Sequence, residues 1–227
     1  MTFRIGFLIF PNIMQLDMSG PHEVFTSVPD TEVRLIWKSL DPITASSGMK
    51  IVPDTTFDDC PDLDLICVPG GAGMTPLLID DETLDFLREK AAKAKYITSV
   101  CTGSLVLAAA GLLNGKRSAC HWMSREMLSD LGAIPDPARV VKDGNHISGG
   151  GVTSGIDFGL TVVAEVFGED VAKGVQLAIE YNPQPPYDAG SPEAAGPTIE
   201  TAARKGAAAR QAERLSNVKQ AAAALGG

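Results

Sequence analysis

The sequence predicts an α/β protein in which helices cover a mostly parallel β-sheet. Short apolar segments have the character of strands buried on both faces, segments of helical spacing alternate with them, and Gly and Pro mark their junctions. The chain has 227 residues, of which 44% are hydrophobic and 21% charged. A chain of this length can bury one sizeable core without disulfide or metal cross-links. We expect one folded domain over residues 1–182, followed by a Pro-rich linker and an Ala-rich helical tail over residues 183–227.

The expected strands are apolar or β-branched runs that end at turn-forming residues. The first run is stopped by Pro11 and Asn12, and the last is a hairpin with an Asp-Gly turn. The runs cover residues 3–10, 32–37, 63–68, 96–100 and 140–148.

Helical spacing predicts a helix in most of the intervals between these strands. The first helix is expected to open at Ser19-Gly20-Pro21, because Pro is tolerated in a first turn. The others are expected over residues 81–95, 105–110, 123–131, 154–167 and 169–180. Since strands alternate with helices, the strands are expected to run parallel.

The composition changes after Tyr181. Residues 182–187 read as an extended linker, which the segment 192–197 prolongs, and residues 201–225 have the Ala-rich composition of a single helix. Alanine buries little area, so this helix is expected to rest on a partner subunit or on the surface of the domain. A loosely attached tail and a clamp between two subunits remain open alternatives.

Charge and hydropathy exclude several classes of protein. The formal net charge of −9 argues against nucleic acid or an anionic membrane as a partner. The apolar stretch Ile5–Phe10 is too short for a signal sequence or a membrane span. We therefore expect a soluble, cytoplasmic protein.

The cysteines and histidines do not form a recognisable framework. The four cysteines are too scattered for a disulfide scaffold and lack zinc-site spacing, which suits a reducing compartment. The three histidines are too few and too far apart to indicate a metal, so no metal is expected. These residues are Cys60, Cys67, Cys101, Cys120, His22, His121 and His146.

The strongest chemical signal is the segment Ser99–Gly103, which has the form of a nucleophile elbow between a strand and a helix. Small residues at both ends allow the sharp turn that lifts Cys101 above the edge of the sheet. The N-terminus of the following helix is expected to favour the thiolate. The alternative is that Cys101 is a small buried hydrophobic residue.

The other cysteines are weaker candidates for a nucleophile. Cys67 lies within an apolar strand, and Cys60 follows two acidic residues in what reads as a solvated loop. Cys120 adjoins His121 and is the more serious competitor, but adjacent residues seldom point toward each other.

The loops that follow parallel strands meet at one edge of the sheet, so the loop after the first strand is expected near Cys101. This loop carries one acid, Asp17, between two apolar residues. Burial would favour its neutral form, which could then donate a proton to a thiolate. Asp17 could instead cap the helix near Gly20. Thr102, directly after the thiol, cannot serve as a base, so any base must be Asp17 or a water molecule.

Two Gly-rich loops are expected at the same edge. The N–H groups of Gly70 and Gly71 could bind a developing negative charge, whereas the loop lacks the residues of a nucleotide site. The segment with Gly150 and Val152 could gate a pocket or could be a plain turn. His121 could line the pocket or simply pack.

Taken together, these motifs resemble the ThiJ/PfpI superfamily, and among its members those that hydrate isocyanides (isonitriles). The resemblance covers the chain to about residue 182. It rests on Val100–Ser104, Leu107–Leu113, His121-Trp122, Thr153–Asp157, Gly70-Gly71 and the acid at Asp17.

The resemblance implies a flavodoxin-like three-layer sandwich, a homodimer, and neither a metal nor an organic cofactor. It implies that Cys101 attacks a small-molecule isocyanide and that Asp17 transfers protons. Water then releases an N-substituted formamide from a thioimidate, with Thr102 holding the water or the carboxyl in place. Gly70, Gly71, Gly150, Val152 and His121 are the expected pocket residues.

Two other functions are compatible with the same motifs. One is glyoxalase or deglycase chemistry on reactive carbonyls, although the related branches place a His after the Cys or a Glu where Asp17 stands. The other is a non-catalytic ligand-sensing or redox-sensing module, like the sensing domains of AraC-type regulators. The Ala-rich tail has neither the length nor the pattern of their helix-turn-helix units.

Overall fold

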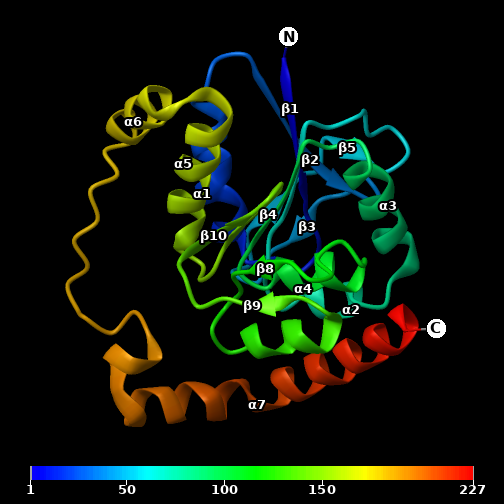
Figure 1. Ribbon diagram of the computed structural model, residues 1–227, viewed down its shortest axis with the longest axis vertical. Helices are drawn as coiled ribbons and strands as arrows, with labels where there is room; N and C mark the ends of the chain where they lie inside the picture. Colours follow the sequence, from blue (N-terminus) through cyan, green and yellow to red (C-terminus); the bar gives the residue numbers. More distant parts are fainter. Residues whose placement is uncertain (1, 227) are drawn as a thin grey trace.

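A computed structural model describes residues 2–226 and shows a three-layer sandwich around a seven-stranded sheet (Figure 1). The strand order is β10-β11-β7-β6-β1-β2-β5, and every neighbouring pair is parallel except β10 and β11. The predicted α/β class and mostly parallel sheet are therefore confirmed. The strands are β1 (Phe3–Leu8), β2 (Thr31–Trp37), β5 (Thr55–Thr56), β6 (Leu65–Val68), β7 (Tyr96–Val100), β10 (Val140–Asp143) and β11 (His146–Gly149).

Two small two-stranded sheets lie outside the central one. The antiparallel pair is β3 (Ile43–Thr44) with β4 (Lys50–Ile51), and the parallel pair is β8 (Arg117–Ser118) with β9 (Ile134–Pro135). These pairs brace the connections that surround the central sheet.

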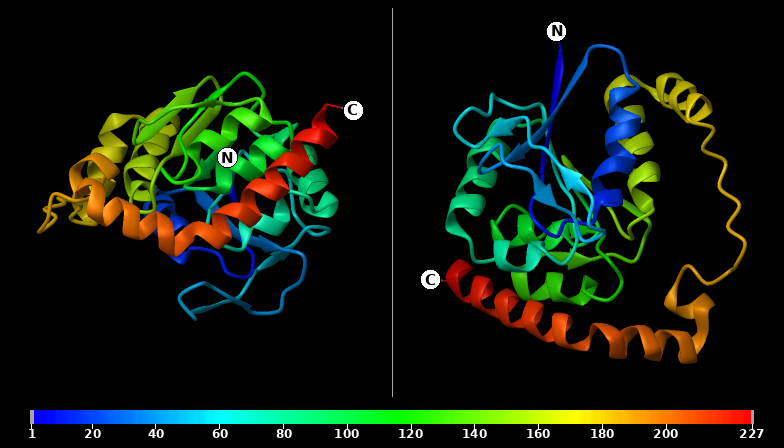
Figure 2. Two further views of the ribbon diagram at one scale, coloured as in Figure 1. Left: turned by 90° about the horizontal axis from the view of Figure 1, so that it is seen from below. Right: turned by 180° about the vertical axis from the view of Figure 1, so that it is seen from behind.

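Helices cover both faces of the sheet, as Figures 1 and 2 show. Helices α1 and α5 pack side by side on one face, and α3 and α4 contact each other on the opposite face. Helix α6 follows α5 and packs against it. The helices are α1 (Gln15–Thr26), α2 (Met74–Leu77), α3 (Asp81–Ala91), α4 (Gly103–Ala109), the 3₁₀-helix η1 (Arg125–Leu131), α5 (Ser154–Phe167) and α6 (Glu169–Ala178).

Helix α1 is longer at its N-terminus than the sequence predicts. It begins at Gln15 rather than near Ser19, so Pro21 lies inside the helix. Gly155 on α5 makes room for this proline, because a Cβ on Gly155 would lie 2.9 Å from the Pro21 ring. Packing of the two helices thus outweighs the usual cost of an internal proline.

The Ala-rich segment forms one long helix, α7 (Pro192–Leu225), with a kink at Gly196. It begins earlier than expected, since the side chain of Ser191 accepts a hydrogen bond from the N–H of Ala194 and Pro192 lies in the first turn. The expectation that residues 192–197 prolong the linker is therefore wrong. Four side chains of α7 are buried: Ala207, Arg214, Val218 and Ala221.

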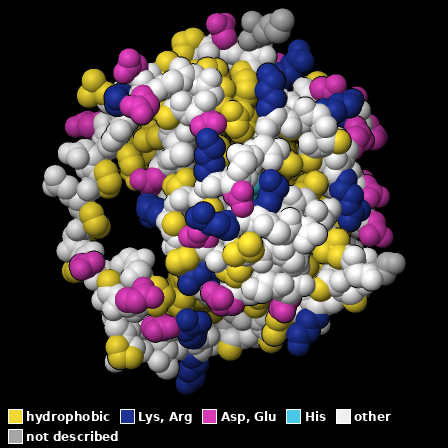
Figure 3. Space-filling model, in the orientation of Figure 1, with side chains coloured by type: hydrophobic (Ala, Val, Ile, Leu, Met, Phe, Trp, Pro, Cys, Tyr) yellow, Lys and Arg dark blue, Asp and Glu magenta, His cyan; other side chains and the backbone are white. Residues whose placement is uncertain are grey.

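Helix α7 docks on the domain's own surface, where it contacts α2, α4 and η1 and crosses one end of the sandwich (Figures 1 and 2). The connecting residues 182–191 are exposed and arc away from the domain, which leaves an opening visible between them in Figure 3. The helix therefore rests on the surface of the domain rather than forming a loosely attached tail, and a clamp between two subunits stays a prediction.

The start of α4 lies unusually close to the end of β6. A Cβ on Gly103 would lie 1.8 Å from the carbonyl oxygen of Val68. We therefore expect Gly103→Ala to lower the free energy of unfolding by about 3 kcal/mol, because the helix must move off the strand. Gly174→Ala is a matched control, since Gly174 is helical and has no atom within 4 Å of the added Cβ. Urea unfolding of both variants tests this, and equal effects would contradict it.

Candidate active site

The carboxyl ends of β1, β6 and β7 bring three loops together, as expected for an open parallel sheet. Backbone hydrogen bonds join the first two loops: the N–H of Met14 donates to the carbonyl of Gly70 at 2.9 Å, and the N–H of Gly73 donates to Asn12 at 3.1 Å. The start of α1 is therefore fixed against the loop that follows β6.

Cys101 occupies the predicted elbow. It follows β7 directly, has φ of 59° and is 4% exposed. The N–H of Cys101 donates to the carbonyl of Gly149 at 2.9 Å, and the carbonyl of Cys101 accepts a hydrogen bond from the hydroxyl of Ser104 at 3.2 Å. A positive φ is uncommon for a residue with a side chain and marks a position held by its surroundings.

Asp17 is completely buried in the first turn of α1. The N–H of Gly70 donates to its Oδ2 at 3.0 Å, while Oδ1 has no hydrogen-bond partner within residues 2–226. The alternative that Asp17 caps a helix is wrong, because the capping position is Met14 and no side chain caps it.

Gly70 is the contact point between the acid and the elbow. A Cβ there would lie 2.5 Å from the backbone nitrogen of Thr102 and 2.9 Å from Asp17 Oδ2. The next N–H, that of Gly71, donates to Thr102 Oγ1 at 3.2 Å. Both N–H groups thus orient the acid and the threonine, and their role in binding a developing charge stays a prediction.

Burial shifts the ionisation of the thiol and the carboxyl. It raises the pKa of Asp17 to about 7, against smaller opposing effects of Cys101 and of the Gly70 N–H. Burial, followed by the charges of Asp17 and Cys120, raises the pKa of Cys101 well above its usual value, although the N–H of Thr102 lowers it. The N–H of Thr102 thus favours the thiolate, as expected of a helix N-terminus, but burial outweighs it and favours the protonated thiol. Asp17 is the group that titrates near neutral pH.

The other three cysteines are also free and buried. Burial raises the pKa of Cys60 and of Cys120 to about 11 and that of Cys67 to about 12. Cys60 is 6% exposed, so the expectation of a solvated loop is wrong. The charge of Asp17 also acts on Cys67, but Cys67 lies fully buried within strand β6.

A cavity of about 160 Å³ opens onto Cys101 and Thr102. Gly71, His121 and Val152 line it, as expected. Gly150 instead lines a neighbouring cavity of about 720 Å³, which shares His121 and Val152 with the first. The remaining residues around the smaller cavity are Met14, Ser46, Ala72, Met123, Arg210, Gln211 and Arg214.

Three of these wall residues come from helix α7 and were not predicted from the sequence. They are Arg210, Gln211 and Arg214, and the last is 3% exposed. The buried positions of α7 fall on one stripe, so Arg214 is a single cation on an otherwise apolar helix face. This placement is the signal that could have revealed it.

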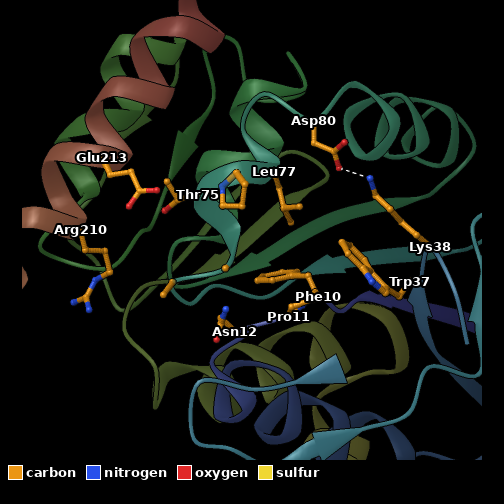
Figure 4. A pocket seen from close by; sticks show the side chains of 13 residues that line it. Phe10, Pro11, Asn12, Trp37, Lys38, Thr75, Leu77, Asp80, Arg210 and Glu213 are labelled. Carbon is orange, nitrogen blue, oxygen red and sulfur yellow. Dashed lines mark ion pairs between the residues drawn. The ribbon is translucent and has the colours of Figure 1, made fainter. Parts of the chain in front are cut away.

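A third cavity, of about 670 Å³, lies on the other side of Arg210. Figure 4 shows Arg210 and Glu213 at one edge, the rings of Phe10 and Trp37 along the floor, and the Lys38–Asp80 ion pair opposite. Arg210 and Ala72 line both this cavity and the one at Cys101, so Arg210 stands where the two meet.

His121 lies in the wall with its Nδ1 accepting a hydrogen bond from the N–H of Met123 at 3.3 Å. Burial, and then the charges of Arg214 and Arg210, lower its pKa. Over residues 2–226, no cluster of three His, Cys, Asp or Glu side chains could hold a metal ion. Within the same residues, no helix is both long and apolar enough to cross a bilayer.

Comparison with known proteins agrees with the fold. The model of the DJ-1/PfpI family matches residues 3–165. The chain therefore belongs to the DJ-1/PfpI family, which confirms the resemblance seen in the sequence.

Within this family, the chain is 55% identical over 225 residues to an isonitrile hydratase of Pseudomonas putida, with 99% of each chain covered. A solved structure of a ThiJ/PfpI family protein from Pseudomonas syringae superposes with a TM-score of 0.93 at 43% identity, covering 96% of this chain and 91% of that one. The transcriptional regulator GbdR of Pseudomonas aeruginosa is 28% identical over 187 residues, which cover 78% of this chain and half of the regulator.

Proposed function

We propose that this protein hydrates isocyanides to N-substituted formamides, with Cys101 as the nucleophile. The observation that carries the proposal is the buried pair of Cys101 and Asp17, in which a carboxyl with a pKa of about 7 stands beside a protonated thiol. The full-length similarity to an isonitrile hydratase supports the same activity.

The first half of the reaction adds the thiol across the terminal carbon of R–N≡C. The Asp17 carboxylate takes the proton from Cys101, and the sulfur attacks the electrophilic carbon. Asp17 then gives the same proton to that carbon, which leaves the thioimidate R–N=CH–S–Cys101. Such proton transfer by a positioned carboxyl is typical of general acid–base catalysis.

The second half adds water to the thioimidate carbon. Asp17 takes a proton from the attacking water and passes it to the nitrogen. The second hydrogen of the water moves through Asp17 to the sulfur as the carbon–sulfur bond breaks. The products are R–NH–CHO and the Cys101 thiol, so atoms and charge balance without any cofactor.

The neighbouring residues have supporting roles in this proposal. Thr102 holds the water or the carboxyl in register, and the hydrogen bond that its Oγ1 accepts from Gly71 fixes its rotamer. Val152 and His121 line the same cavity as the thiol, and Gly150 allows that wall to adjust. The reaction expels no amine and therefore needs no strong base for that step. The absence of a histidine at position 102 is compatible with it.

We also propose the wider setting of the enzyme. Residues 1–182 form the catalytic domain and residues 183–227 the linker and the helical tail. The protein acts as a homodimer in the cytoplasm, with a small-molecule isocyanide and no nucleic acid as its partner. It uses neither metal nor organic cofactor.

The test is a direct assay of the purified protein with three reagents. Loss of the isocyanide infrared band of a simple alkyl isocyanide, with formation of the formamide, is expected at a rate far above that with methylglyoxal. Faster turnover of methylglyoxal would instead assign carbonyl chemistry. Stable oxidation of Cys101 by peroxide, with turnover of neither substrate, would assign a sensing module.

A further inference from the structure

The cavity beside Cys101 contains a buried cation without a counter-charge. The Arg214 guanidinium donates hydrogen bonds to Ser124 Oγ at 2.8 Å, to Thr75 Oγ1 at 3.3 Å and to the carbonyl of Gly71 at 3.3 Å. All three acceptors are neutral. No carboxylate within residues 2–226 forms an ion pair with Arg214.

The charge of Arg214 is unpaired, and its N–H groups are only partly used. A buried charge is costly unless it is paired, and a guanidinium carries five N–H groups, of which these contacts use three. The three hydrogen bonds therefore orient Arg214 without neutralising it. An anion in the cavity would supply the missing charge and could accept the two remaining N–H groups.

A second cation stands one helical turn away on the same side of α7. Arg210 lines the same cavity as Arg214 and also has no ion pair in the described chain. No Asp or Glu lines this cavity, although the protein as a whole carries a net charge of −9. Two like charges on one wall repel each other, and an anion between them removes that repulsion.

The Cys101–Asp17 pair is the other possible counter-charge, but burial raises the pKa of the Cys101 thiol, which lines the same cavity, and so favours its neutral form. Asp17 is fully buried and does not line the cavity. Gly71 lies between Thr102 and Arg214, because its N–H donates to Thr102 Oγ1 while its carbonyl accepts from Arg214. The guanidinium therefore belongs to the wall that a substrate touches.

We propose that this cavity selects isocyanides that carry a carboxylate, which Arg214 binds and Arg210 attracts at the junction of the two cavities. The reactive group follows from the proposed function, and the anionic group follows from the two arginines. A cavity of about 160 Å³ suits a small isocyano acid, such as isocyanoacetate. The product would then be an N-formyl amino acid, here N-formylglycine.

The first test compares isocyanoacetate with its uncharged methyl ester. Wild type is expected to have a kcat/KM for the acid at least about tenfold higher, which is what one charge-assisted hydrogen bond supplies. Arg214→Met and Arg210→Gln are expected to lose most of this preference through KM. Lys219→Gln, which removes an exposed charge from the same helix, is expected to keep it. Equal turnover of acid and ester by wild type, or equal losses with both substrates in Arg214→Met, would overturn the proposal.

A second test is independent of hydration. Cys101 is alkylated with the anion iodoacetate and with the neutral iodoacetamide. Mass spectrometry gives the ratio of the iodoacetate rate to the iodoacetamide rate. The ratio is expected to fall at least about tenfold in Arg214→Met and to be largely retained in Arg214→Lys, which keeps the charge. If wild type hydrates neither isocyanide, the proposed function fails, and this ratio still decides on the anion site. An unchanged ratio in Arg214→Met and Arg210→Gln would overturn that site.

Discussion

Cys101→Ala is expected to lose all measurable conversion of an isocyanide, a fall of at least about a thousandfold in kcat. The reason is that the thioimidate cannot form without the sulfur of Cys101, which is the cysteine that lines the cavity. The fold is expected to persist, because alanine fits the buried elbow with no added atoms. Formation of formamide, followed by chromatography, measures the loss.

Cys120→Ala is the matched control for this prediction. Cys120 is buried to the same extent as Cys101, at 4% exposure, and lines the neighbouring cavity. It is expected to keep activity within a few-fold of wild type. Retained conversion in Cys101→Ala, or loss confined to Cys120→Ala, would show that the elbow cysteine is not the nucleophile.

Asp17→Asn is expected to lower kcat/KM by about a hundredfold to a thousandfold, because the amide cannot carry the proton from sulfur to carbon. In the wild type, the active form has Asp17 ionised and Cys101 protonated. Since burial raises the pKa of Asp17 to about 7, activity is expected to rise with pH through about 7. Asp17→Asn is expected to lack this rise. A pH–rate profile of both proteins tests the assignment, and an unchanged rise in the variant would contradict it.

The same substitution is expected to stabilise the protein. The pKa of Asp17 is higher in the folded state than its ordinary value of 3.8, so wild type loses stability as pH rises between about 4 and 7. Removing the ionisable group removes this loss, which amounts to at most about 4 kcal/mol above pH 7. Urea unfolding at about pH 4 and pH 8 should therefore show a stabilisation that grows with pH. The same stabilisation at both pH values would mean that ionisation of the Asp17 carboxyl is not its cause.

The sequence predicted the sheet well and the ends of the helices less well. Strand β7 and helix α5 have the predicted bounds, because β-branched runs and a long apolar helix leave little choice. The start of α1 was missed because local rules place Pro21 in a first turn, whereas packing against Gly155 admits it inside the helix. Such tertiary packing cannot be read from a single segment.

Some residues of the candidate site were also predicted from the sequence, and others were missed. Cys101 at its elbow was predicted because both lie within one short segment, and Asp17 beside it because strand topology fixes which loops meet. The contribution of Arg214 was not predicted, because it depends on where a distant helix docks. The helix N-terminus that favours a Cys101 thiolate is visible in the sequence, whereas the burial that outweighs it is not.

The cavity wall that α7 contributes lies far along the sequence from the reacting residues, Cys101 and Asp17. Cys101 and Asp17 are held by the sheet and its first helix, whereas Arg210, Gln211 and Arg214 belong to one helix joined to the domain by an exposed linker. We therefore expect that exchanging this one helix changes the choice of substrate, while Cys101 and Asp17 keep their positions. We expect related enzymes with a different α7 to act on different isocyanides, and chimaeras of this helix are the natural route to redesign.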